Sequence, residues 1–135
     1  MSIGRRRPRV LLADDDPGMH AAISRLLAKS CDLVGSVGDT KALFTAVADL
    51  RPDVVLLDFS LPGGLHTIDV CRRLKATPGV RIVAFTAHDD EDYRRLAFDA
   101  GASMFVWKMQ ASTDLVAAIH AVVDDTARSP GVDSD

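Results

Sequence analysis

The chain has 135 residues, of which 47% are hydrophobic and 26% are charged, and its formal net charge is −3. This length and balance favour one compact, soluble domain with a single core. The negative charge argues against nucleic acid as a ligand of this domain. No apolar stretch approaches the ~20 residues that a membrane span needs, so we expect no membrane contact and a cytoplasmic location.

The two ends of the chain differ in composition from the middle. Residues 1–8 are expected to be a solvated basic tail, and the polar stretch after Asp124 predicts a flexible tail over residues 125–135. Residues 9–124 then form the domain. Four arginines make up the only basic run: Arg5, Arg6, Arg7 and Arg9.

The cysteines and histidines show no metal-ligand spacing. Cys31 and Cys71 lie far apart in the chain, and we expect both to be small buried apolar side chains rather than a disulfide or a zinc site. His20, His66 and His120 have no partner at a suitable spacing either. We therefore expect these three histidines to be solvated.

Two periodicities alternate along the chain. Short apolar runs that stop at a polar residue are typical of strands buried on both faces, and apolar residues at helical spacing predict the helices between them. In chain order we predict a strand over Val10–Ala13, a helix from Pro17 with Asp16 as its N-cap, a strand over Asp32–Val37, a helix from Asp39 or Thr40 to Leu50, a strand over Val54–Leu57, a helix over Thr67–Lys75, a strand over Arg81–Phe85, a helix after an acidic turn at residues 88–92, a strand over Ser103–Trp107 and a last helix capped by Ser112.

The alternation of five strands with five helices implies an α/β fold with a parallel sheet covered on both faces. Right-handed crossovers and the (βα)5 count predict the doubly wound, flavodoxin-like strand order 2-1-3-4-5. In such sheets the functional crevice lies at the carboxyl ends of the strands. The chemistry of this protein is therefore expected at that edge.

Polar side chains follow the predicted strands at this edge. Asp14 and Asp15 follow the first strand, Asp58 the third, Thr86 the fourth and Lys108 the fifth. A hard cation such as Mg²⁺, or Mn²⁺ in its place, takes oxygen ligands and would offset the repulsion between the carboxylates. A carboxylate can also attack phosphorus to form an aspartyl phosphate, with the positive charges stabilising the transferred group. The set predicts metal-assisted phosphoryl transfer to a carboxylate.

Four motifs in this order resemble those of the receiver domains of two-component response regulators: LLADDDPG, VVLLDFSLPGG, VAFTAHDD and GASMFVWK. The resemblance extends over residues 9 to about 124. It implies that Asp58 is the phosphoacceptor and that Asp14 and Asp15 are the acidic pair, with Asp15 as the direct metal ligand and Asp14 acting largely through water. The carbonyl of Ser60 would be the backbone ligand of the metal.

The resemblance assigns the remaining residues to the switch. Thr86 matches the hydroxyl that moves toward the phosphate, Lys108 the lysine that pairs with it, and Phe105 the aromatic side chain that turns into the vacated space. His88 is a candidate flanking residue of the site, although an exposed loop histidine is the favoured interpretation. Trp107 shares the strand face of Phe105.

The implied function is that of a phosphorelay module rather than an enzyme with turnover, apart from self-catalysed phosphoryl transfer and autodephosphorylation. A sensor histidine kinase or a histidine phosphotransfer protein would phosphorylate Asp58. The surface formed by the fourth helix, the fifth strand and the fifth helix would then change shape for a downstream protein or for a second copy of the chain.

The sequence departs from the family pattern at four places. Met109 stands where proline often follows the lysine, so a trans peptide is expected there. The loop over residues 62–67 lacks a usual glycine and is one residue longer, which leaves its conformation open. Phe105 replaces a frequent tyrosine and offers no phenol. Asp16 has no family role and is interpreted as a helix cap.

Three alternatives stay open on the sequence alone. A phosphatase of the haloacid dehalogenase type would use Asp14 as nucleophile, within the Asp-x-Asp of residues 14–16. A flavin or nucleotide binder on the same fold would need a glycine-rich phosphate loop, which the sequence lacks. A receiver-like module could also act by protein contact without phosphorylation.

Overall fold

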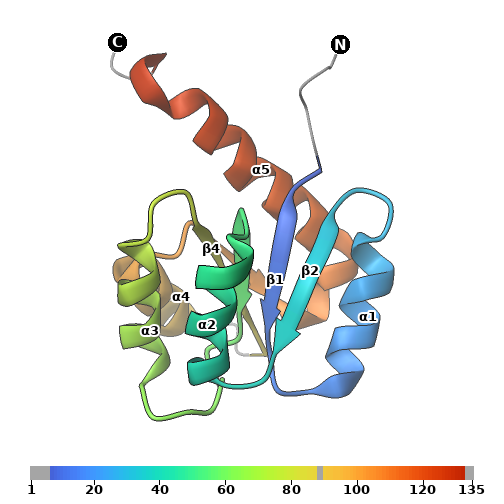
Figure 1. The fold of residues 1–135 in the computed structure, drawn as a ribbon, viewed down its shortest axis with the longest axis vertical. Helices are drawn as coiled ribbons and strands as arrows, with labels where there is room; N and C mark the ends of the chain where they lie inside the picture. Colours follow the sequence, from blue (N-terminus) through green and yellow to red (C-terminus); the bar gives the residue numbers. More distant parts are fainter. Residues whose placement is uncertain (1–6, 88–89, 133–135) are drawn as a thin grey trace.

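The computed structural model describes residues 7–87 and 90–132. Its centre is a five-stranded parallel sheet in the order β2-β1-β3-β4-β5, which confirms the predicted topology (Figure 1). The strands are β1 (Arg9–Ala13), β2 (Asp32–Val37), β3 (Val54–Leu57), β4 (Arg81–Thr86) and β5 (Met104–Trp107). The central strands carry continuous apolar runs because both of their faces are covered.

Helices connect the strands. They are α1 (Pro17–Leu27), α2 (Thr40–Leu50), α3 (Thr67–Lys75), α4 (Glu91–Ala100) and α5 (Ala111–Val132), with a 3-10 turn, η1 (Lys108–Gln110), before α5. A side chain caps each of the first four helices by accepting a hydrogen bond from a first-turn backbone N–H, as expected for groups without an intrahelical partner. The capping residues are Asp16, Asp39, His66 and Asp90. The predicted role of Asp16 is confirmed, and His66, which is exposed as expected, also caps α3.

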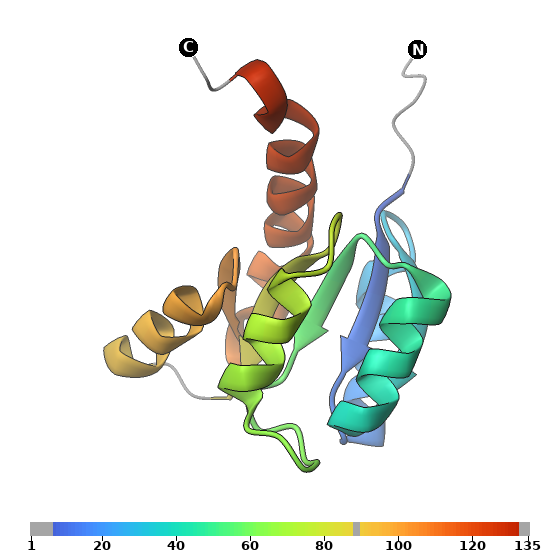
Figure 2. The same cartoon turned by 60° about the vertical axis from the view of Figure 1, so that its left-hand side comes forward.

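The sheet separates two apolar cores. Successive strand residues point to opposite faces, so Leu11 and Ala13 pack under α2, α3 and α4, whereas Val10 and Leu12 pack under α1 and α5. Figure 2 shows the two helical layers from a second side. None of the described helices is long and apolar enough to cross a membrane.

The two cysteines are free and buried, one in each core. Cys31 is 2% exposed beside α1, and Cys71 is fully buried on α3. Burial raises the pKa of Cys71 to about 11, against the smaller opposite effect of nearby Lys75 and Arg72. Both thiols therefore act as small apolar side chains, as the sequence predicts.

The last helix differs from the prediction at both ends. It begins at Ala111, directly after η1, so Ser112 lies inside its first turn and is not the cap. It continues to Val132 and extends past the sheet (Figure 2), where a flexible tail was expected from residue 125. Residues 125–129 contain neither glycine nor proline, so a helix that is already formed can propagate through them.

The basic run is partly structural instead of solvated. The Arg7 guanidinium donates to the carbonyls of Ala28 at 2.6 Å and Cys31 at 2.7 Å, just beyond α1. Arg9 donates in the same way to two carbonyls at the end of α2, at 2.7 and 2.8 Å. Carbonyls at a helix end lack intrahelical partners and carry partial negative charge, which favours a cation there. The residues before Arg7 lie outside the described part of the chain.

Candidate functional site

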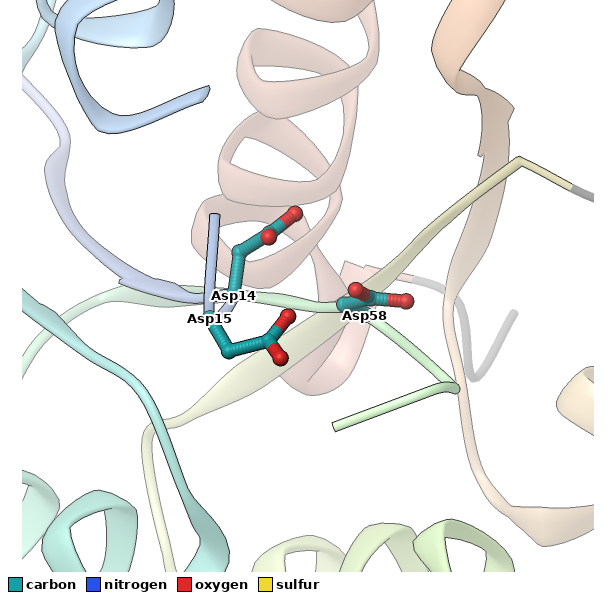
Figure 3. A group of neighbouring side chains, drawn as sticks. All are labelled: Asp14, Asp15 and Asp58. Carbon is teal, nitrogen blue, oxygen red and sulfur yellow. The ribbon is translucent and has the colours of Figure 1, made fainter. Parts of the chain in front are cut away.

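Three carboxylates meet at the carboxyl edge of the sheet. Ala13 of β1 lies opposite Leu57 of β3, so the residues that follow these two strands are neighbours. Asp14, Asp15 and Asp58 each offer an oxygen such that all three oxygens lie within 4.8 Å of one another (Figure 3). Asp14 is fully buried and Asp58 is 4% exposed, whereas Asp15 is exposed. The cluster therefore opens to solvent on the side of Asp15.

Backbone hydrogen bonds hold the two buried carboxylates. Asp58 Oδ1 accepts from the N–H of Ser60 at 2.9 Å, and Asp14 Oδ1 accepts from the N–H of Asp16 at 2.9 Å. The ring nitrogen Nε2 of His20 lies 2.6 Å from the carbonyl oxygen of Asp14, so His20 has a partner beside the site, contrary to the expectation that it is solvated. In each carboxylate the second oxygen, Oδ2, faces Lys108.

Lys108 joins the two buried aspartates. It follows β5, and its long side chain reaches past the end of β4, where its ammonium lies 5.5 Å from the centre of the Phe85 ring. Nζ lies 2.6 Å from Asp14 Oδ2 and 3.2 Å from Asp58 Oδ2. Burial by itself lowers the pKa of Lys108, but the hydrogen bonds and charges of Asp14 and Asp58 outweigh it, so the pKa is raised. Lys108 is a permanent cation at neutral pH.

The donor set fits a hard divalent cation. It consists of carboxylate oxygens, which Mg²⁺ prefers, and the exposed Asp15 leaves room for the waters that this ion retains. Asp14 Oδ2 is buried without a hydrogen bond of good geometry and is compensated through the charge of Lys108. A buried carboxylate oxygen that lacks hydrogen bonds is suited to a cation or to water held by one.

A profile of the response regulator receiver domain matches residues 10–120. The chain belongs to the response regulator receiver family. It is 41% identical over 115 residues to the DNA-binding response regulator MtrA of Mycolicibacterium smegmatis. The aligned residues make up 85% of this chain and 50% of MtrA. The chain thus spans about half the length of the curated relatives it matches. The predicted family is confirmed, and the chain contains a receiver domain of the two-component type.

Solved receiver structures agree with this assignment. A two-component response regulator of the LuxR family from Aurantimonas sp. superposes with a TM-score of 0.80 at 30% identity, over 88% of this chain and 86% of that chain. The isolated REC domain of RcsB from Salmonella enterica, in the presence of the phosphomimetic BeF3⁻, gives a TM-score of 0.80 at 26% identity, over 88% and 90% of the two chains.

The residues that the sequence predicts as the switch lie on β4 and β5. Thr86 is fully buried at the end of β4, and Phe105 is 8% exposed within the core under α4. The Arg94 guanidinium covers the Phe105 ring, 4.6 Å from its centre. Trp107 points its indole N–H at the carbonyl of Ala87, at 3.1 Å. Phe105 is thus buried in this structure, and His88 lies outside the described residues.

Tyr93 is a site neighbour that the sequence pattern did not identify. It counted as an apolar residue of its helix, but it is half-buried, and Thr86 and Asp58 both lie close enough to affect the pKa of its phenol. Its ring contacts Phe59 edge-on, with the ring centres 5.9 Å apart. Burial raises the pKa of Tyr93; the Thr86 hydroxyl opposes this, and the charges of Asp58 and Asp90 add to it. Helical spacing shows which face a residue takes but not where a phenol oxygen ends, so no sequence signal revealed the contact.

The longer loop between β3 and α3 is fixed at both ends. The hydroxyl of Thr67 donates to the carbonyl of Phe59 at 2.8 Å, beside Asp58. On the other side, the N–H of Thr40 donates to the carbonyl of Pro62 at 3.0 Å, which attaches the loop to the start of α2. The Lys108–Met109 peptide is trans as predicted, since the described residues contain no cis bond.

Replacing Gly63 by alanine is expected to lower the free energy of unfolding by about 1–3 kcal/mol. Gly63 has a φ of +145°, and a Cβ there would lie 2.9 Å from Thr40 Cβ and overlap its hydroxyl. Gly64→Ala is the matched control, because a Cβ at Gly64 meets nothing within 4 Å. Urea unfolding of both variants measures the difference, and equal midpoints would show that the loop is not fixed on α2.

Proposed function

We propose that this domain accepts a phosphoryl group on Asp58 with the help of Mg²⁺ and thereby switches a protein-binding surface. The observation that supports this most directly is the position of the Asp58 carboxylate. It is 4% exposed, lies 3.2 Å from the Lys108 ammonium and belongs to a three-carboxylate cluster. A buried carboxylate beside an ammonium and two further acids supports a role in chemistry, because titratable groups are gathered and buried in this way mainly at functional sites.

The roles of the individual residues follow from their positions. A carboxylate oxygen of Asp58 forms the bond to phosphorus while the bond to the donor nitrogen breaks. Asp15, Asp58 and the carbonyl of Ser60 would hold Mg²⁺, with Asp14 acting through water, and the bound ion would supply positive charge to the phosphoryl oxygens. Lys108, whose ammonium lies 3.2 Å from Asp58 Oδ2, contributes a second positive charge.

The phosphorylated state differs from the resting state in its charge balance. In the resting state the Lys108 ammonium neutralises Asp14 and Asp58. In the phosphorylated state the phosphoryl group attracts the Lys108 ammonium away from these two carboxylates. The hydroxyl of Thr86 donates to another phosphoryl oxygen. The Phe105 side chain, which lies against the Arg94 guanidinium, moves into the space that Thr86 leaves. The surface formed by α4, β5 and α5 changes shape as a result.

The partners follow from this chemistry. A sensor histidine kinase or a histidine phosphotransfer protein supplies the phosphoryl group, and the α4-β5-α5 face binds a downstream protein or a second copy of the chain. We place these events in the cytoplasm. Residues 9–124 form the receiver domain, after a basic segment at 1–8, and α5 continues beyond it to Val132. We assign no nucleic acid contact and no turnover of a separate substrate to this domain.

The experiment is phosphorylation by acetyl phosphate with Mg²⁺, followed by mass spectrometry of the intact protein and its peptides. We expect one added phosphoryl group at Asp58, absent with a chelator and absent in Asp58→Asn. A label on Asp14 would instead indicate the haloacid dehalogenase chemistry. A wild-type protein that stays unmodified would indicate a receiver-like module that acts without phosphorylation.

A further inference from the structure

A side chain of α1 holds the peptide group between Asp14 and Asp15. His20 lies near the start of α1 and is half-buried, and its ring nitrogen Nε2 lies 2.6 Å from the carbonyl oxygen of Asp14. Because a carbonyl oxygen only accepts hydrogen bonds, the ring is the donor and carries a proton on Nε2. Among the residues that the structure describes, no backbone N–H donates to this carbonyl. The imidazole is therefore its partner within the described chain.

The orientation of this peptide sets the direction of the Asp15 side chain. The carbonyl of Asp14 and the N–H of Asp15 belong to one planar group, so a rotation of that plane changes the backbone angles on both sides of it. In the structure the Asp15 carboxylate lies beside that of Asp58 (Figure 3). A different orientation of the peptide would move the Asp15 carboxylate relative to Asp58.

Asp15 depends on its backbone more than the other two carboxylates of the cluster do. Asp14 and Asp58 each accept a backbone N–H at Oδ1 and face the Lys108 ammonium with Oδ2. The Asp15 carboxylate is exposed, and no described residue forms a hydrogen bond or an ion pair with it. A ligand without contacts of its own must be ordered when the ion binds, and this ordering lowers the affinity.

We propose that His20 is a positioning residue of the metal site: its Nε2–H fixes the Asp14–Asp15 peptide so that the Asp15 carboxylate faces Asp58 before a divalent cation binds. This inference rests on the proposed binding of Mg²⁺ by the cluster. Groups that orient metal ligands contribute to metal affinity without touching the metal. The inference adds to the site a residue of α1 that no metal-ligand spacing in the sequence identifies.

The test is the Mg²⁺ affinity of the full chain, measured by titration of its ¹H–¹⁵N NMR spectrum, which also shows whether each variant is folded. His20→Leu keeps an apolar, helix-forming side chain but has no donor, and His20→Ala is a second variant of this kind. We expect both to bind Mg²⁺ about 3- to 10-fold more weakly, the effect of losing one hydrogen bond.

His20→Gln is the conservative variant. Its amide Nε2 is the same number of bonds from the backbone as the ring Nε2 and also donates, so it should restore most of the affinity although it can carry no charge. His120→Leu, at a half-buried position of α5, is the matched control and should bind like the wild type. Equal affinities of wild type and His20→Leu would overturn the proposal, as would a loss that His20→Gln does not reduce.

A second measurement needs no ion. The amide nitrogen of Asp15 belongs to the peptide that His20 holds, so its ¹⁵N resonance in the metal-free protein should move in His20→Leu and return toward the wild-type position in His20→Gln. The amide of Asp58, which donates to the carbonyl of Ala13 at 3.0 Å, should stay in place and is the internal control.

The outcomes separate this inference from the proposed function. An Asp15 resonance that is the same in wild type and His20→Leu would refute the role of His20 and leave Mg²⁺ binding by the cluster intact. A wild-type protein that does not bind Mg²⁺ would instead refute the proposed metal site, and this inference with it.

Discussion

Lys108→Met is expected to lower the free energy of unfolding by about 3 kcal/mol in the absence of divalent cations. The ammonium lies within 3.2 Å of both Asp14 and Asp58, which are 1% and 5% exposed in their side chains. Methionine keeps an apolar stem but leaves two buried carboxylates without a counter-charge. We expect the low end of the range for a broken buried ion pair because the Lys108 side chain is 16% exposed.

Urea unfolding at neutral pH measures this loss. The control is Lys41→Met, which removes an exposed lysine on α2. Its free energy of unfolding should change by no more than about 0.5 kcal/mol. The pKa of Lys108 is raised above its ordinary 10.5, so its contribution is complete below that pH and disappears as the pH rises through the higher folded-state value. A loss no larger than that of Lys41→Met would show that the lysine is not paired in solution.

Mg²⁺ is expected to stabilise the wild-type protein by about 2.7 kcal/mol at one hundred times its dissociation constant. In Asp15→Asn most of this gain should disappear, because a charged ligand of the exposed side of the cluster is lost. Without the ion the same variant should be slightly more stable than the wild type, since one of three mutually repelling carboxylates has been removed. Thermal unfolding with and without Mg²⁺ measures both effects.

Asp16→Asn is the matched control for this metal test. Asp16 is adjacent in sequence and also exposed, but its carboxylate accepts from the N–H of Gly18 at 2.9 Å and caps α1. Asparagine caps a helix about as well as aspartate, so the variant should keep both its stability and its response to Mg²⁺. If Asp15→Asn and Asp16→Asn responded alike, the cation would be held by the general charge of the loop and not by the cluster.

The parallel sheet and the carboxylate cluster were predictable because both follow from strong local patterns. A strand such as Val54–Leu57 is apolar throughout and stops at Asp58, and the topology alone then brings Asp58 beside Asp14. Contacts made by long or rotatable side chains were not predictable. Arg7 was expected in solvent but bonds to the end of α1, and the ring of Tyr93 packs edge-on against Phe59, a contact that no periodicity encodes.

Predicted helix ends were less accurate than helix positions. Ser112 is a good capping residue by type, but the 3-10 turn over Lys108–Gln110 leads directly into α5, so the helix begins at Ala111, two residues before the Thr113 that a Ser112 cap would imply. A favourable cap is used only where the preceding chain has an extended conformation. The length of α5 shows the same effect, because propagation through residues 125–129 depends on the helix before them and not on their own polarity.

The distribution of the two free cysteines allows the folding of the two layers to be followed separately. Cys31 belongs to the core beneath α1 and α5, and Cys71 to the core beneath α2, α3 and α4. Both are closed to reagents in the native state, at 2% and 0% exposure. A thiol reagent can therefore react with each cysteine only when its side of the sheet opens transiently. The ratio of the labelling rates of Cys31 and Cys71 then shows whether the two layers open as one cooperative unit.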